Sequence, residues 1–316
     1  MGRRMLPLIL MYHRIADEPL DHWGLAVSPE RFDEQLRVLR RTRHPLPLAE
    51  FVRNFVAGTL PRDAVALTFD DGYADNLQAG LPRLVAADVP ATVFLATGYL
   101  DNPGPFWWDE LARRVLTADR LNSSEIVVRG QTIHLETAGR ENGVVPVGAP
   151  NGRTAVLERV YEPLRQLNEA ERRSAMIELR AIFPAGKDQP HLGRAMTGEE
   201  VRTLAASGLV TIGAHSVTHP VLPRLAADAC RYEIVASKLT CGTLIEAPVD
   251  AFAYPFGEFN SAVCETVRDA GFAFACSTQR GPVALASDLF ALPRVYVANL
   301  DGDAFERRLR AISGDG

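Results

Sequence analysis

The chain has 316 residues, of which 47% are hydrophobic and 23% are charged. These fractions are typical of a globular protein and exclude a largely disordered chain, a collagen-like chain and a coiled coil. The formal net charge is -5, from 34 basic and 39 acidic residues, which leaves no basic surface for nucleic acid. We therefore expect no nucleic-acid partner and a small neutral or polar substrate.

The length suits either two domains or one α/β barrel that carries an insertion. The apolar stretch 6–12 near the start is far shorter than the ~18 residues that cross a membrane. No small-residue cleavage site precedes His13, so we do not expect a signal peptide. These features predict no transmembrane segment and a cytoplasmic location, with a substrate that is either cytoplasmic or presented at the inner face of the membrane.

Short apolar runs alternate with segments of helical periodicity, which is typical of a parallel sheet. A serine followed by a proline at Ser28 predicts the start of a helix that continues to about residue 43. Thr197 and Glu200 predict a capping box at the start of another helix. The expected strands cover residues 7–13, 64–70, 91–96, 210–215, 251–254, 272–277 and 292–297. Seven strands with intervening helices predict an α/β fold, a (β/α)7 barrel rather than an open sheet.

Residues 101–195 interrupt this alternation. The pattern predicts a helix near 109–116, a hairpin over 126–135 that turns at Arg129 and Gly130, and one long helix over 154–179. We therefore expect one barrel over residues 1–316, interrupted by a mixed helical and hairpin insertion at 101–195.

The strongest chemical signal is a buried-type strand that ends in two carboxylates and a glycine, ALTFDDG at 66–72. Neighbouring strand residues point to opposite faces, so Asp70 and Asp71 can serve one site only if the strand breaks between them. Gly72 permits such a break. Two carboxylates this close repel each other unless a cation sits on one of them. The alternative is a solvated turn or a helix N-cap without chemistry.

The second signal is GAHSVTHP at 213–220, again at the end of an apolar strand. Pro220 favours a loop, and the two imidazoles of His215 and His219 suit a metal ion, although either could be a structural histidine. The C-terminal ends of barrel strands meet at one mouth, so Asp71 could join the two histidines there.

Three such ligands would leave a coordination position open for water, as in catalytic metal sites. A metal in such a site lowers the pKa of water to about 7 and polarises a carbonyl, which are the two needs of amide or ester hydrolysis. Asp70, if it is not a ligand, is then free to act as the general base.

The two motifs, TFDDG at 68–72 followed by HSVTH at 215–219, resemble those of the polysaccharide deacetylase family of metal-dependent carbohydrate esterases, which contain the NodB-homology domain. The resemblance implies a distorted barrel of about seven strands. It also implies a divalent metal, typically Zn²⁺, and the removal of N-acetyl or O-acetyl groups from an amino sugar or glycan. It covers the chain up to about residue 100 and from about residue 196, and leaves the insertion unexplained.

The same resemblance assigns roles to single residues. Asp70 looks like the general base, with water at the metal as the nucleophile, and Asp71, His215 and His219 look like the metal ligands. The segment AYPFG at 253–257 takes the place of the family's Arg-x-Pro-Tyr motif, whose last residue donates its backbone N–H to the oxyanion. Phe256 keeps that donor, and Tyr254 is expected to contact the substrate.

Two departures from the family pattern lead to further predictions. The arginine of the Arg-x-Pro-Tyr motif is Ala253 here, and its nearest replacement is Arg294, at the end of a late strand. Arg294 could keep Asp70 ionised or form an ordinary surface ion pair. The family's C-terminal Leu-x-His element, which usually supplies the general acid, is also missing, because no histidine follows His219.

His13, in MYHR at 11–14, resembles the N-terminal Tyr-His element of the circularly permuted branch that acts on poly-N-acetylglucosamine. We predict that His13 protonates the leaving amine, with a structural role as the alternative. Two tryptophans are weaker candidates for substrate contacts. Trp23 would make a contact at the rim, and Trp107 could stack on a sugar ring or anchor the insertion against the barrel.

Three other functions stay open at this point. The same chemistry could hydrolyse another carbon–nitrogen bond, such as a formyl or cyclic amide. Two histidines and one carboxylate are also the ligand set of non-haem iron oxygenases. The third alternative is a non-catalytic carbohydrate-binding relative, against which the retained Asp70 argues, because a binding module needs no free base beside the metal.

Overall fold

The computed structural model describes residues 5–118, 125–128, 130–134, 150–184 and 193–313. Arg129 of the predicted hairpin turn lies outside these residues, as does most of the loop expected after the hairpin. The chain divides into two units, which are described separately. Unit 1 comprises Met1–Asn102 and Ala195–Gly316, and unit 2 comprises Pro103–Arg194.

The parallel sheet of unit 1 contains the seven strands that the sequence predicts. They are β1 (Leu8–Tyr12), β5 (Ala64–Phe69), β6 (Ala91–Leu95), β9 (Val210–Ala214), β10 (Ala251–Ala253), β11 (Phe274–Cys276) and β12 (Val295–Tyr296). Their order is β11-β10-β9-β6-β5-β1-β12. A parallel bridge from Leu292 to Cys276 links the chain just before β12 to β11, so the two ends of the row meet. The α/β fold class and the distorted barrel are confirmed.

Three short strands were not predicted. β4 (His44–Pro45) pairs with the first residues of β5, and β2 (Arg14–Ile15) pairs with β3 (Ala26–Val27). Each has two residues, which is too short to show the alternation by which strands are recognised.

The strands of the barrel are buried on both faces. On β5, Val65, Leu67 and Phe69 belong to the cluster that packs against the surrounding helices. Ala64 and Ala66 belong to a second cluster, which joins Ile9, Phe94 and Ala253 of other strands across the interior of the barrel. This inner cluster also contains apolar side chains of α2 (Leu48–Val56). Since side chains alternate along a strand, Thr68 and Asp70 continue the inward row of Ala66. The first aspartate is therefore directed into the barrel.

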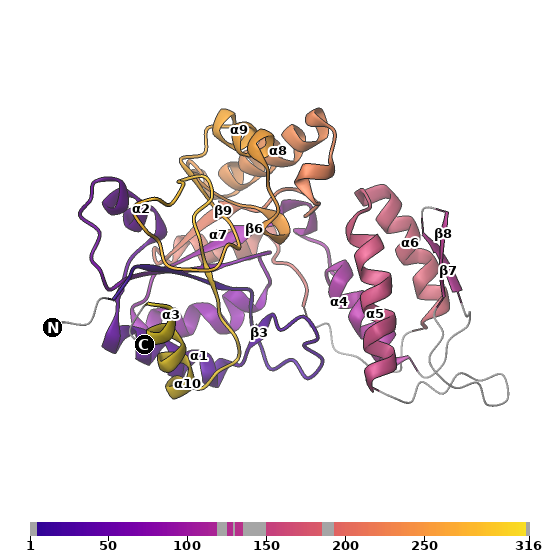
Figure 1. Cartoon of the computed structure of the whole chain (residues 1–316), viewed down its shortest axis with the longest axis horizontal. Helices are drawn as coiled ribbons and strands as arrows, with labels where there is room; N and C mark the ends of the chain where they lie inside the picture. Colours follow the sequence, from indigo (N-terminus) through magenta and orange to yellow (C-terminus); the bar gives the residue numbers. More distant parts are fainter. Residues whose placement is uncertain (1–4, 119–124, 129, 135–149, 185–192, 314–316) are drawn as a thin grey trace. The chain divides into compact units, whose positions relative to one another are not determined.

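Two helices of unit 1 begin where the sequence places their caps. The Ser28 side chain accepts a hydrogen bond from the Arg31 N–H, and Thr197 and Glu200 form the predicted capping box. In Figure 1, α1, α3 and α10 lie together on one side of unit 1. Besides α2, the α-helices of unit 1 are α1 (Pro29–Thr42), α3 (Leu81–Ala87), α7 (Gly198–Ala206), α8 (Ala227–Ile245), α9 (Ser261–Asp269) and α10 (Gly302–Ile312). A π-helical turn, η1 (Asn76–Gly80), precedes α3.

Unit 2 combines helices with an antiparallel hairpin, as predicted (Figure 1). Its elements are α4 (Trp107–Thr117), β7 (Glu125–Val128), β8 (Gln131–His134), α5 (Pro150–Arg165) and α6 (Glu169–Ile182). The prediction of one long helix over 154–179 is wrong. The chain breaks after Arg165, and Asn168 opens α6 in a capping box with Glu171, which gives the second helix its own start.

Trp107 lies in the interior of unit 2. Its ring stacks on that of Tyr161 at a centroid distance of 5.3 Å, and the guanidinium carbon of Arg172 lies 5.2 Å from the ring centroid. A buried ring held in this way has little surface to offer a sugar, so the structure does not support Trp107 as a substrate contact. None of the described helices combines the length and the apolar character needed to span a membrane.

Candidate metal centre and its surroundings

The three predicted metal ligands lie together beyond the ends of β5 and β9. Asp71 Oδ1 is 3.6 Å from His215 Nε2 and 3.4 Å from His219 Nε2, and all three residues are buried. Their ligand atoms lie within 4.8 Å of one another. One oxygen and two nitrogen donors this close fit a divalent ion, which holds each such ligand at about 2 Å. The sequence prediction that these residues converge is confirmed.

The extended backbone conformation is interrupted between Asp70 and Asp71, as the sequence analysis requires. Asp71 itself adopts a φ of 71° and Gly72 a φ of 82°, so the chain turns sharply just after β5 and the two aspartates can face one region. Ser216 and His219 also have positive φ angles, of 65° and 53°. A non-glycine residue in the left-handed region lowers the stability of the fold by about 1–3 kcal/mol, and such residues cluster at functional sites.

Hydrogen bonds orient both histidines. The Nδ1 of His215 lies 2.7 Å from the Ala253 carbonyl oxygen, and donation to this carbonyl leaves the Nε2 lone pair for a metal. The backbone N–H of His219 donates to Ser216 Oγ at 3.0 Å. Burial lowers the pKa of His215, which favours the neutral imidazole that metals bind.

Glu233 of α8 holds the loop between the two histidines, a role that the sequence analysis missed. One carboxylate oxygen accepts the backbone N–H groups of Val217 and Thr218, both at 2.8 Å. The other accepts the Thr218 hydroxyl at 2.7 Å. A single glutamate within a helix resembles any solvent-facing residue, so no sequence signal marks it.

Asp70 forms a buried two-point ion pair with Arg294. The guanidinium donates from Nη1 to Asp70 Oδ1 and from Nη2 to Oδ2, both at 2.7 Å. It also donates to the Thr68 hydroxyl at 3.1 Å and to the Ser277 carbonyl at 2.9 Å. The predicted pairing with Asp70 is therefore confirmed, and the alternative of a surface ion pair is wrong because both partners are buried.

Arg294 does not lie at the C-terminal end of a strand, contrary to the prediction, but reaches Asp70 from deeper inside the barrel. It precedes β12, whose Val295 pairs with Leu10, so Arg294 lies at the level of Ile9. Its side chain extends upward inside the barrel to the carboxylate. Burial alone would raise the pKa of Asp70, but the charge and hydrogen bonds of Arg294 hold it well below its usual range. Asp70 is therefore ionised at neutral pH.

His13 follows β1 at the same end of the sheet. The Asp70 N–H donates to the Tyr12 carbonyl at 3.0 Å, so His13, the next residue, begins beside Asp70. Burial lowers the pKa of His13 to about 4, so its imidazole is neutral at neutral pH. Its Nδ1 is buried, with no hydrogen-bond partner in the described part of the chain.

The remaining candidates differ in their surroundings. Phe256 has a φ of 58°, and its ring lies edge-on to that of His219 at a centroid distance of 4.4 Å. Its ring is thus beside a candidate metal ligand, and its role as an oxyanion donor stays a prediction. Trp23 is half-buried in the loop between β2 and β3 and packs against His22, and its rim contact also stays a prediction.

The structure does not support Tyr254 as a substrate contact. Its side chain is fully buried, its ring stacks on that of Phe259, and its hydroxyl donates to the Phe290 carbonyl at 2.8 Å. An inward tyrosine whose hydroxyl already has a partner is a core residue.

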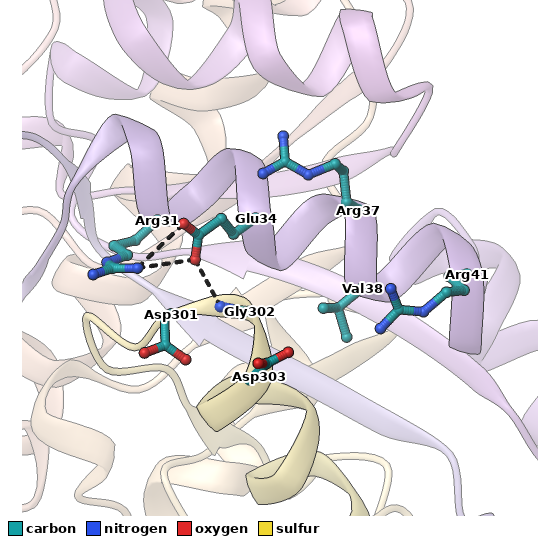
Figure 2. A pocket seen from close by; sticks show the side chains of 8 residues that line it. All are labelled: Arg31, Glu34, Arg37, Val38, Arg41, Asp301, Gly302 and Asp303. Atoms are coloured by element: carbon teal, nitrogen blue, oxygen red, sulfur yellow. Dashed lines mark hydrogen bonds and ion pairs between the residues drawn. The ribbon is translucent and has the colours of Figure 1, made fainter.

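A separate hollow lies between α1 and the start of α10 (Figure 2). None of the candidate site residues lines it. Arg31 pairs with Glu34, which also accepts the Gly302 N–H at 2.7 Å. Asp301 caps α10 by accepting the Ala304 N–H. Acidic and basic groups thus compensate each other in this hollow.

Comparison with known proteins places this site in a family. A model of the family described as polysaccharide deacetylase matches residues 57–136 and 181–275. The chain belongs to the polysaccharide deacetylase family. The resemblance indicated by the two motifs is therefore confirmed.

A poly-beta-1,6-N-acetyl-D-glucosamine N-deacetylase of Escherichia coli strain K12 is 24% identical over 295 residues, which are 92% of this chain and 36% of that protein. The chain thus spans about a third of the length of this relative. Among solved structures, IcaB from Ammonifex degensii superposes with a TM-score of 0.61 and 17% identity over 98% of both chains. The Streptococcus pyogenes deacetylase PplD, in complex with acetate, superposes with a TM-score of 0.58 and 18% identity over 99% of both chains. These structures share the fold of this polysaccharide deacetylase family member.

Proposed function

We propose that this chain is a metal-dependent hydrolase that removes N-acetyl groups from amino sugars of a glycan. The observation that carries the proposal is the buried Asp71, His215 and His219 cluster beside an ionised Asp70. Family membership and the name of the E. coli relative support a carbohydrate amide as the substrate. The donor set suits Zn²⁺.

A divalent ion at this cluster would lower the pKa of water and polarise the acetyl carbonyl. The ionised Asp70 accepts a proton from the attacking water, and Arg294 fixes its carboxylate through two hydrogen bonds. The backbone N–H of Phe256 stabilises the oxyanion.

Cleavage of the amide also needs a proton on the departing nitrogen. We assign its delivery to His13, which is neutral before the reaction. The proton that reaches the amine therefore comes from the attacking water. Asp70 removes this proton from the water, His13 accepts it from Asp70, and His13 then donates it to the departing nitrogen. Both groups return to their starting states, and the products are acetate and a free amine.

The test uses a β-1,6-linked N-acetylglucosamine oligomer, the substrate type named for the E. coli relative. We expect equal amounts of acetate and free amine from the metal-loaded protein. The Asp70→Asn variant should keep its metal and lose activity at least 100-fold, whereas the exposed control Asp269→Asn should behave as wild type.

Other outcomes would point to other functions. Formate released from an N-formyl analogue, with no acetate from the acetylated oligomer, would favour a different carbon–nitrogen bond. A metal-loaded protein that releases neither product would support the carbohydrate-binding alternative. Oxygen consumption would indicate an iron oxygenase, although the Asp70–Arg294 pair favours hydrolysis.

A further inference from the structure

Two side chains that follow the catalytic aspartates bind the backbone around His13. Asn76 Nδ2 donates to the His13 carbonyl oxygen at 2.8 Å. Asp75 Oδ1 accepts the Ile15 N–H at 3.0 Å. Asn76 is only 2% exposed, so its hydrogen bond is shielded from water. The segment 13–15 is thus bonded at its first and last residues to the stretch of chain that begins with Asp70 and Asp71.

Arg14 extends this attachment. Its Nε donates to Asp75 Oδ2 at 3.0 Å, and its Nη1 donates to Glu18 Oε2 at 3.0 Å. Its guanidinium carbon also lies 5.0 Å from the centroid of the Tyr73 ring. Charge-assisted bonds of this kind have defined directions. They are mostly buried here, with side-chain exposures of 4%, 14% and 10% for Arg14, Asp75 and Glu18.

The local backbone places Asn76 for this contact. Asn76 is the first residue of η1, a single π-helical turn. Such turns are rare in proteins, and those that occur are often found at functional sites. Its amide also donates to Asp75 Oδ1 at 3.3 Å. One loop therefore carries the base, a metal ligand and the two groups that hold His13.

We propose that Asn76 and Asp75 are positioning residues for the general acid: they hold the His13 imidazole in place relative to Asp70 and the metal ligands. The inference rests on the role of His13 given under the proposed function. Small displacements of a catalytic group can cost about 100-fold in rate. Loss of the Asn76 bond should therefore slow the step that needs the proton more than the other steps.

Two substrates separate these steps. An N-acetylglucosamine oligomer releases an amine, which must be protonated, whereas 4-nitrophenyl acetate releases a stable phenolate without a proton. The experiment measures kcat on both for wild type, Asn76→Ala, His13→Ala and the double variant. Gln78→Ala is the matched control, because Gln78 is an exposed amide on the same turn.

We expect Asn76→Ala to lower the amide-to-ester ratio of kcat by roughly 10- to 100-fold. The double variant should have the same ratio as His13→Ala, since both changes act through one imidazole. Gln78→Ala should keep the wild-type ratio. If Asn76→Ala does not fold, Asp75→Asn provides the same comparison, and a metal assay with thermal melting identifies folded variants.

Two results would overturn the inference in different ways. If Asn76→Ala lowers both activities equally, or adds its effect to that of His13→Ala, Asn76 supports only the fold and the role of His13 stands. If His13→Ala itself leaves the ratio unchanged, the general-acid assignment fails, and the positioning role fails with it.

Discussion

At the scale of single residues, the site keeps an arginine–aspartate pair although the arginine lies elsewhere in the sequence. The place of the family's motif arginine is held by Ala253, which instead offers its carbonyl to His215 Nδ1 at 2.7 Å. Arg294 supplies the guanidinium from the neighbourhood of β12. The barrel brings both segments to one interior, so Arg294 pairs with Asp70 although the two residues are far apart in the sequence.

The first prediction concerns this pair. Arg294→Met leaves the buried Asp70 without its cation, so the free energy of unfolding should fall by about 3–5 kcal/mol in urea denaturation. The Arg294→Met/Asp70→Asn double variant should recover part of this loss, because no charge is then buried alone. Arg280→Met, at an exposed arginine, is the control. A single variant as stable as wild type would contradict the pairing.

His13 gives a prediction for pH. Burial sets its folded pKa near 4, below the ~6.5 of an unfolded histidine, so the unfolded chain binds the proton first as pH falls. The contribution of the neutral His13 imidazole to the free energy of unfolding is complete above about pH 6.5. It is lost as the pH falls towards 4, by up to about 3 kcal/mol. Metal-free wild type should therefore lose more stability over this range than metal-free His13→Gln. Parallel curves for the two proteins would show that His13 is not buried in its neutral form.

At the scale of elements, the long buried strands and the capped helix starts were predictable from the sequence. Apolar runs marked the seven strands, and the ligand types at two strand ends marked the metal cluster. The long helix of the insertion was predicted wrongly because the Asn168 cap lies within a continuous polar and apolar pattern. Contacts between distant segments, such as those of Glu233, have no signature of their own.

Glu233 leads to the prediction at this scale. Glu233→Ala removes the acceptor for three donors of the histidine loop. Groups that orient metal ligands typically contribute 10- to 100-fold to metal affinity, and we expect a loss of this size. Competition with a fluorescent chelator measures it, with the exposed Asp228→Asn on the same helix as control. Wild-type affinity in Glu233→Ala would show that the loop holds its shape unaided.

At the scale of the whole molecule, the chain passes from unit 1 into unit 2 after Asn102 and returns to unit 1 at Ala195, and these two points of unit 1 are neighbours. The Asp101 N–H donates to the Met196 carbonyl at 3.3 Å, and the Gly198 N–H donates to Asp101 Oδ1 at 3.0 Å. The residues that flank unit 2 are therefore joined within unit 1 itself. All the candidate metal ligands, together with Asp70, His13 and Arg294, belong to unit 1.

We therefore predict that unit 1 folds after residues 103–194 are replaced by a short Gly-Ser linker. The shortened protein should be monodisperse in gel filtration, unfold cooperatively by circular dichroism, and bind one divalent ion per chain. Aggregation, or a folded product without metal, would show that unit 1 depends on unit 2.

The most direct test of the account is a crystal structure of the metal-loaded protein with anomalous scattering at the metal edge. The account predicts one anomalous peak per chain, about 2.0–2.2 Å from a carboxylate oxygen of Asp71 and from the Nε2 atoms of His215 and His219. An ion bound by other side chains, or no ion between these three in zinc-saturated crystals, would contradict it.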